Sequence, residues 1–255
     1  MNHRQVLNGF PCQNLALLLY RLEDLSTKKA REGFWSPFVQ KAEKSLQSPT
    51  FQGLLEAIEA RQKSILAAYS AAGWATPPTR GKVAWRLAVG LSSGKRSDAM
   101  AFALHPLYGV PYLPASAIKG AVAHYSIEKG APQALRKRIF GSEPERETAR
   151  GEVIFLDAFP QPGAKPYLRA DIINVHYQDY YTGKIPKPPA DYWDPVPNGF
   201  MTIAKGVRFE FRVASRDGEL AGQARSLLAE CLQNYGVGAK TRGGYGYFDV
   251  EEAKP

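Results

Sequence analysis

The sequence predicts an α+β fold of the ferredoxin-like type, with a helical N-terminal extension and a long insertion. Two observations lead to this class. Residues 1–75 carry helical hydrophobic periodicity, and a diproline at 77–78 marks a change of pattern. From residue 82 the expected order is strand, helix, strand, insertion, two strands, helix and strand, which is the β-α-β-β-α-β pattern.

This pattern suggests two regions. We expect a helical region at 1–80 packed on a core at 81–255, with the insertion at about 159–199. The chain has 255 residues, of which 44% are hydrophobic and 22% charged. That composition is ordinary for a globular protein and excludes a collagen-like or wholly disordered chain.

The helical region is predicted from three segments. Residues 14–25 carry leucines at helical intervals, Pro37 suits the first turn of a second helix, and residues 51–72 form the longest periodic run. Gly73 ends that run.

The core elements follow from changes of period. We expect strands at 82–91, 151–158, 201–204, 207–213 and 245–250, and helices at 114–128, 132–140 and 217–234. The apolar residues on one side of the last helix, which we expect to be its buried face, are Leu220, Ala224, Leu227, Leu228, Cys231 and Leu232. The strands at 201–204 and 207–213 are expected to pair around Lys205-Gly206. The insertion at about 159–199 lies between the strands expected at 151–158 and 201–204 and is rich in proline and tyrosine. A loop of that length is usually functional.

A glycine-rich loop near the C-terminus is the most informative motif. Residues 236–246 read GVGAKTRGGYG, so cations lie among glycines whose backbone tolerates close approach. Successive N–H groups in such a loop favour phosphate, and Tyr245 and Tyr247 offer flat faces to a base. An ATP-binding P-loop is excluded because Ala239 precedes the lysine and the loop joins a helix to a strand. A plain helix cap and turn remains an alternative.

A second phosphate-suited element is the start of the helix at 114–128. Ser116 lies near the expected N-cap, and Lys119 lies within the first turns. Free N–H groups at a helix N-terminus favour an anion, so both residues are candidates for binding one. The alternative is an ordinary solvated lysine.

Charge and cysteine content restrict the function further. The net charge of +9 suits a polyanion-binding protein, although a basic surface can also serve only solubility.

The cysteines indicate the compartment. Cys12 and Cys231 are far apart, which fits a reduced, cytoplasmic protein without disulfides. No run is long enough to span a membrane and the N-terminus lacks signal-peptide features. The four histidines have no metal-ligand spacing, so we expect neither a metal nor a cofactor.

The insertion supplies the last candidates. His176 and Tyr177 lie among tyrosines and cations, a combination that suits single-stranded nucleic acid. Three alternatives remain: a histidine that only orients the loop, a protein contact, and a catalytic histidine as in metal-independent nucleases. Asp157, Asp171 and Asp179 are interpreted as structural.

Several motifs together resemble a known family. Gly236, Gly238, Gly244 and Gly246 match the glycine loop of the RAMP superfamily of CRISPR proteins, and residues 113–120 resemble its first-helix motif. Residues 157–160, 171–177 and 180–181 narrow the resemblance to the sixth-subunit family of type III-B (Cmr) effector complexes. Val175 departs from an expected proline, and Arg242-Gly243 from the small residues more usual there.

This resemblance implies an RRM-like RAMP fold and a non-catalytic RNA-binding scaffold. Such a subunit would bind guide RNA near its 3′ end, cap the backbone filament, meet target RNA, and contact the backbone RAMP subunit, the small helical subunit and the other head RAMP subunit. The alternative is a metal-independent endoribonuclease that processes CRISPR RNA. The candidate RNA-binding residues are Ser116, Lys119, His176, Tyr177, Gly236, Gly238, Lys240, Thr241, Arg242, Gly243, Gly244 and Tyr245.

Overall fold

The structure is a computed structural model of the chain. It describes residues 14–17, 42–91, 103–141, 149–163, 167–181, 183 and 196–251. Most of the helix expected at 14–25, and the helix expected to start at Pro37, lie outside these residues. Helix α2 (Leu15–Leu17) is the described part of the first.

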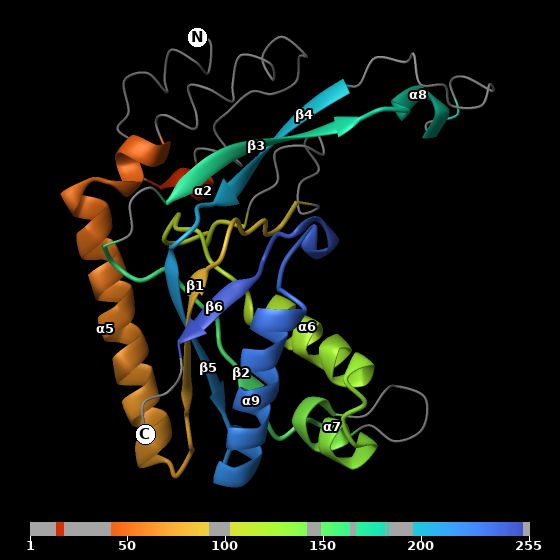
Figure 1. The fold of residues 1–255 in the computed structure, drawn as a ribbon. Coiled ribbons are helices and arrows are strands. Elements are labelled where there is room, and N and C mark those ends of the chain that lie inside the picture. The colour runs from red at the N-terminus through yellow and green to blue at the C-terminus, as the bar shows by residue number, and fades with distance from the viewer. Residues whose placement is uncertain are drawn as a thin grey trace.

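A four-stranded antiparallel sheet forms the centre of the fold (Figure 1). Its strands are β1 (Pro78–Val83), β2 (Ile154–Phe155), β5 (Arg208–Ala214) and β6 (Phe248–Glu251), in the order β2-β5-β1-β6. Because β5 lies between β1 and β2, the first strand–helix–strand unit is split, as in the ferredoxin-like pattern. The predicted α+β class is confirmed.

Two helices cover one face of this sheet. They are α6 (Ala115–Glu128) and α9 (Gly218–Asn234), with α7 (Gln133–Phe140) beside them (Figure 1). The side chains of Phe209 and Phe211 are fully buried beneath the helices, and the ring of Phe248 meets both edge-on. The predicted face of α9 is confirmed, since Leu220, Ala224, Leu227, Leu228, Cys231 and Leu232 are all buried.

Helix α5 (Pro49–Ala71) lies on the opposite face (Figure 1). Ser48 caps it by accepting a hydrogen bond from the N–H of Phe51, and Pro49 suits its first turn. Only the first half of α5 packs into the core, through Phe51, Leu55 and Ile58. We therefore expect its second half to be held by polar contacts.

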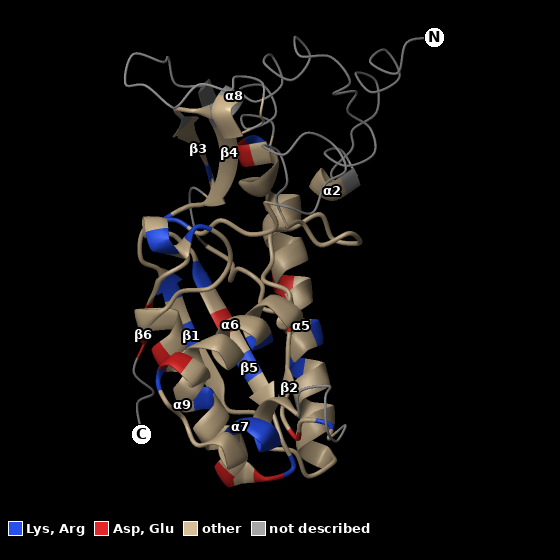
Figure 2. Cartoon of the chain, turned by 90° about the vertical axis from the view of Figure 1, so that its right-hand side faces the viewer, with Lys and Arg blue, Asp and Glu red and all other residues tan. Residues whose placement is uncertain are grey.

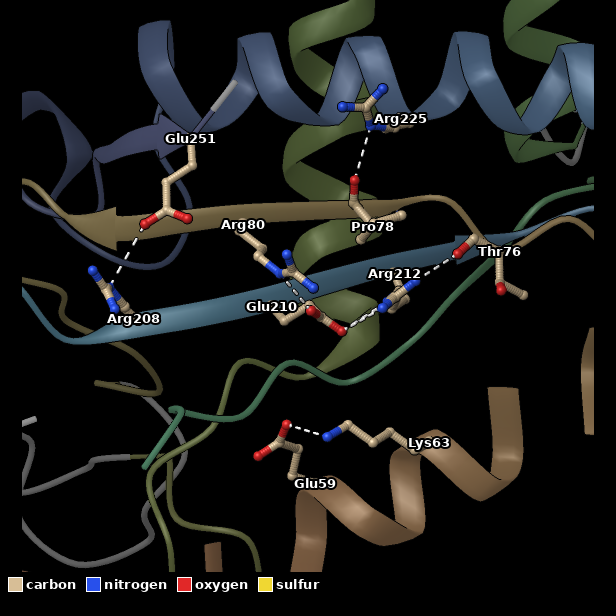
Figure 3. Close-up of polar contacts among 10 residues, drawn as sticks. All are labelled: Glu59, Lys63, Thr76, Pro78, Arg80, Arg208, Glu210, Arg212, Arg225 and Glu251. Carbon is tan, nitrogen blue, oxygen red and sulfur yellow. Dashed lines mark hydrogen bonds and ion pairs between the residues drawn. The ribbon is translucent and has the colours of Figure 1, made fainter. Parts of the chain in front are cut away.

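The sheet face toward α5 is charged (Figure 3). Glu210 accepts hydrogen bonds from Arg80 at 2.8 Å and from Arg212 at 2.6 Å. Burial would raise the pKa of Glu210, but the hydrogen bonds from these two arginines lower it below the ordinary value. This face carries ion pairs where an RNA-binding sheet of the RRM type presents aromatic rings.

A two-stranded arm extends from one end of the sheet (Figure 1). It consists of β3 (Leu168–Val175) and β4 (Val196–Ile203), paired antiparallel, and the short helix α8 (Gln178–Tyr181) follows β3. The expected pairing of 201–204 with 207–213 is wrong, because β4 pairs with β3 while β5 pairs with β1 and β2. Alternation predicts a strand but not its partner, and here the tight connection at Gly206 (φ +82°) passes the chain from arm to sheet.

The strand expected at 82–91 is also placed differently. Strand β1 starts at Pro78 and ends at Val83. A start at Pro78 is possible because a proline is tolerated at the first residue of a strand. Residues Leu87 and Ala88 leave the sheet and form isolated bridges to Ile203 of the arm and Ala239 of the glycine loop. The segment after β1 therefore joins these two parts. The division of the chain at residue 80 stays a prediction.

None of the helices in the described part of the chain is both long and apolar enough to cross a bilayer.

Candidate nucleic-acid interface

The glycine loop (residues 236–246) begins two residues after α9 ends. Gly236, Gly238, Gly244 and Gly246 all have positive φ, between +79° and +95°. A Cβ at Gly246 would overlap the carbonyl oxygen of Val237, and one at Gly238 would overlap that of Ala88. The spacing of the four glycines thus follows from backbone conformation and close approach.

Most N–H groups of the loop are used inside the protein. Those of Val237, Ala239 and Gly246 donate to the carbonyl oxygens of Gly246, Ala88 and Arg86, at 2.9, 2.7 and 2.8 Å. The loop is therefore a rigid turn anchored on the segment after β1. Within the described part of the chain, the N–H groups of Gly238, Lys240, Thr241 and Arg242 donate to no backbone acceptor. Those of Thr241 and Arg242 begin the turn that follows Lys240, so this pair of open amides suits an anion.

Lys240 stands at the start of the turn Thr241–Gly243, a short 3₁₀ helix. It has φ +60°, which makes it the one non-glycine residue with positive φ among those described. Its carbonyl oxygen accepts hydrogen bonds from Gly243 and Tyr245, and its Nζ lies 5.2 Å from the ring centroid of Phe200. A left-handed lysine costs conformational energy that surrounding contacts must offset, a feature common at functional sites.

Tyr245 is held in place on three sides. Its ring lies 4.9 Å from that of Trp85 and 5.7 Å from that of Phe200, and its hydroxyl donates to Asp171 Oδ2 at 2.8 Å. Burial, with the carboxylate of Asp171 adding to it, raises the pKa of Tyr245 to about 12. The phenol thus links the glycine loop to the arm.

Asp171 on β3 is the centre of this junction. Besides Tyr245, it contacts Arg86, whose Nη1 lies 3.2 Å from Asp171 Oδ2. The same nitrogen donates to the carbonyl oxygen of Ala170 at 2.8 Å. Figure 2 shows lysines and arginines on the loops between the sheet and the arm. One carboxylate therefore fixes the arm, the loop and the segment after β1 to one another.

The start of α6 lies at the same end of the molecule as the glycine loop. Helices α6 and α9 are antiparallel, because Lys129 pairs with Glu230 while His124 contacts Tyr235, with 5.7 Å between ring centroids. Tyr235 directly precedes the loop, so the first turns of α6 continue toward it.

The N-terminus of α6 differs from expectation. Pro114 occupies the N-cap position and Ser116 is the second helical residue, exposed to solvent. Asp157 Oδ1 accepts a hydrogen bond from the N–H of Ala115 at 2.7 Å, so an internal carboxylate already occupies part of this anion-binding end. Lys119 is half-buried and forms no ion pair within the described part of the chain.

His176 and Tyr177 lie elsewhere. They follow β3, about 15 Å along the strand direction beyond Asp171. His176 is exposed, and its ring centroid lies 6.1 Å from that of Tyr177. The predicted residues thus divide between the loop end of the sheet and the outer end of the arm.

Trp85 and Arg86 were missed from the sequence. Their segment was interpreted as part of a strand, which places the tryptophan in the sheet rather than beside the glycine loop. In the structure Trp85 is 47% exposed and adjoins Gly244. A tryptophan-arginine pair in a basic chain was the available signal.

A separate cavity lies between α5 and the charged sheet face. Its volume is about 210 Å³, and its lining includes His105, Tyr108, Asp157 and Arg61. The ring of His105 stacks on that of Tyr108 with 4.4 Å between centroids, and burial lowers the pKa of His105 although Asp157 opposes the shift.

The described residues contain no group of three or more acidic, histidine or cysteine side chains able to hold a metal.

Comparison with known families shows the family of this chain. The family model described as the RAMP superfamily matches residues 91–249. The chain belongs to the RAMP superfamily. The glycine loop and α6 both lie within the matched RAMP region, as the motifs predicted.

Two curated relatives are similar to this RAMP protein. The CRISPR system Cmr subunit Cmr6 of Pyrococcus furiosus is 35% identical, over 54% of this chain and 58% of the relative. A Cmr6 subunit of Saccharolobus solfataricus is 31% identical, over 65% of this chain and 54% of the relative. The chain thus spans little more than half the length of these relatives.

One solved structure shares the RAMP fold. A chain in the cryo-EM structure of the type III-B Cmr-beta complex bound to cognate target RNA superposes with a TM-score of 0.68 at 24% identity. The match covers 94% of this chain and 80% of the other. This likeness supports the α+β RAMP fold.

Proposed function

We propose that this chain is a non-catalytic RNA-binding scaffold subunit of a type III-B (Cmr) CRISPR effector complex. It binds guide RNA near its 3′ end and caps the backbone filament, where target RNA also passes. Its partners are the backbone RAMP subunit, the small helical subunit and the other head RAMP subunit, in the cytoplasm. Membership in the RAMP superfamily and the names of the two relatives support this assignment.

The observation that carries the proposal is the geometry of the turn at 240–242. Lys240 and Arg242 flank two amides without an internal acceptor, on a loop made rigid by its other hydrogen bonds. A rigid turn of this kind binds phosphate without ordering itself first. Lys119, on the α6 end nearest the loop, supplies a further cation, and Ser116 an exposed hydroxyl.

The remaining predicted residues have supporting roles in this proposal. Gly236, Gly238, Gly243 and Gly244 shape the turn, and Tyr245 fixes it to Asp171. His176 and Tyr177 would meet RNA or a neighbouring subunit at the outer end of the arm.

The test is the salt dependence of RNA binding. Lys119→Ala with Lys240→Ala should weaken binding of single-stranded RNA of any sequence, and reduce the slope of log affinity against log salt by about 0.7 per lost phosphate contact. Lys44→Ala with Lys63→Ala is the matched control, because it removes two exposed lysines on the α5 side. Equal affinities and slopes in both double variants would refute the proposal.

The endoribonuclease alternative has a separate test. His124 lies 3.6 Å from Glu128 on an exposed side of α6, and His176 lies on the arm, so the two histidines belong to different parts of the fold. The scaffold proposal expects a CRISPR repeat RNA to stay intact with the protein in EDTA. Cleavage that is abolished by His176→Ala or His124→Ala would establish the enzyme instead.

A further inference from the structure

We propose that the indole of Trp85 stacks on one base of the single-stranded RNA whose backbone lies on the glycine loop. This inference rests on the proposed function and adds to it a contact with a base. It follows from the placement, support and surroundings of the ring.

The ring of Trp85 is exposed yet held in position. It is 47% exposed, although tryptophan is usually largely buried in a folded domain. Tyr245 supports it with 4.9 Å between ring centroids and 48° between ring planes, and Tyr245 is itself fixed by Asp171. A supported aromatic ring stacks on a ligand with little loss of side-chain entropy.

The ring adjoins the phosphate-suited turn directly. A Cβ at Gly244 would lie 3.9 Å from Trp85, so the backbone of the turn approaches the six-membered part of the indole. The N–H of Gly244 donates to the carbonyl oxygen of Thr241, which places the two open amides of Thr241 and Arg242 in the same turn. A phosphate on these amides would bring its own or the next base to the indole.

The surroundings favour a nucleic acid over a protein surface. Among the described residues, Trp85 contacts Gly244 and Tyr245 and lies near cations: the guanidinium of Arg86 is 5.7 Å from the ring centroid, and Lys240 and Arg242 lie on the adjoining loop. The nearby carboxylate of Asp171 is engaged by Arg86 and Tyr245. Protein-docking tryptophans usually lie within an apolar patch, whereas stacking platforms for single strands lie among cations.

The experiment compares normal RNA with the same RNA carrying abasic sites, using the full 255-residue chain. Trp85→Ala should weaken binding of normal single-stranded RNA by roughly 5- to 150-fold, the range expected for one stacked base. The loss should nearly vanish on abasic RNA, and the salt slope should stay unchanged because no phosphate contact is removed. Trp85→Phe should retain most of the affinity.

Trp74→Phe is the matched control. The Trp74→Phe substitution should leave RNA affinity unchanged, because Trp74 contacts Tyr69 and Arg216 rather than the glycine loop. Circular dichroism and thermal midpoints check that each variant folds. Trp85→Leu carries the test if Trp85→Ala does not fold, because leucine keeps an apolar side chain without a stacking ring and should show the same loss. Full affinity of Trp85→Ala, an equal loss on normal and abasic RNA, or a crosslink of Trp85 to protein would overturn the inference.

The same measurements separate this inference from the proposed function. If the lysine variants weaken RNA binding and Trp85→Ala does not, only the stacking inference is wrong and the proposed function stands. If the chain binds no RNA, or neither set of variants weakens binding, the proposed function is wrong as well.

Discussion

At the scale of single residues, Lys240 shows how the loop combines strain with charge. Its backbone is left-handed, a conformation that costs an L-residue roughly 1–2 kcal/mol and costs glycine almost nothing. Its side chain meanwhile lies over Phe200, and its backbone directly precedes the two open amides. We infer that Lys240 contributes positive charge to the loop and lowers the stability of the fold.

Two substitutions separate these effects. Lys240→Gly and Lys240→Ala both remove the charge, so both should weaken RNA binding equally. The glycine variant should be more stable than the alanine variant by about 1 kcal/mol, because alanine keeps the left-handed penalty. Urea unfolding measures the difference, and an alanine variant at least as stable as the glycine variant would show that the turn relaxes.

At the scale of elements, the glycine loop and the strand order differ in how far the sequence predicts them. The periodicity of 217–234 predicted α9 and its buried face correctly, because a long amphipathic helix is defined by its own residues. The pairing of β4 with β3 was not predicted, because strand partners depend on contacts between distant segments. For the same reason Trp85 could not be placed beside Gly244, although both residues are evident in the sequence.

The loop itself offers a prediction with an internal control. Gly246→Ala should destabilise the protein by more than about 2 kcal/mol, since it combines positive φ with a Cβ that overlaps the carbonyl oxygen of Val237. Gly243→Ala should be nearly neutral, because its φ is not positive and its nearest neighbour is 3.6 Å away. Thermal unfolding compares the two, and equal midpoints would contradict the described path of the loop.

At the scale of the whole molecule, Asp171 adds a polar junction between the arm and the body to the backbone hydrogen bonds that join Leu87 and Ile203. Its hydrogen bond from Tyr245 and its ion pair with Arg86 join β3 to the glycine loop and to the segment after β1. Beyond Asp171 the arm carries exposed apolar side chains, among them Ile172 and Tyr181. The orientation of that surface therefore depends on the base of the arm, where these polar contacts accompany the buried side chains of Leu168, Met201 and Ile203.

The hydrogen bond from Tyr245 has a predicted pH dependence. The pKa of Tyr245 is raised to about 12, whereas a tyrosine in an unfolded chain titrates near 10. The stability that the protonated phenol of Tyr245 contributes is therefore complete below about pH 10 and is lost as the pH rises toward about 12. Tyr245→Phe should lower stability at pH 8 and should flatten the decline above pH 10.

The measurement is the difference in free energy of unfolding between wild type and Tyr245→Phe across this range. Solvent reaches part of the ring, so the change should be smaller than the full pKa difference implies. Tyr247→Phe is a suitable comparison, since Tyr247 is half-buried on the same segment. A wild-type minus Tyr245→Phe difference that is constant with pH would rule out this role for the phenol.

The shared carboxylate at Asp171 also has a thermodynamic consequence. A ligand that shifts Tyr245 or Arg86 would change the free energy of the arm's position, because both residues contact the same oxygen, Asp171 Oδ2. By reciprocity, a partner that fixed the arm in the position favoured by such a ligand would raise the affinity of the loop by the same factor. Within the proposed function, RNA affinity at the loop and subunit contact at the arm would therefore be energetically linked through Asp171.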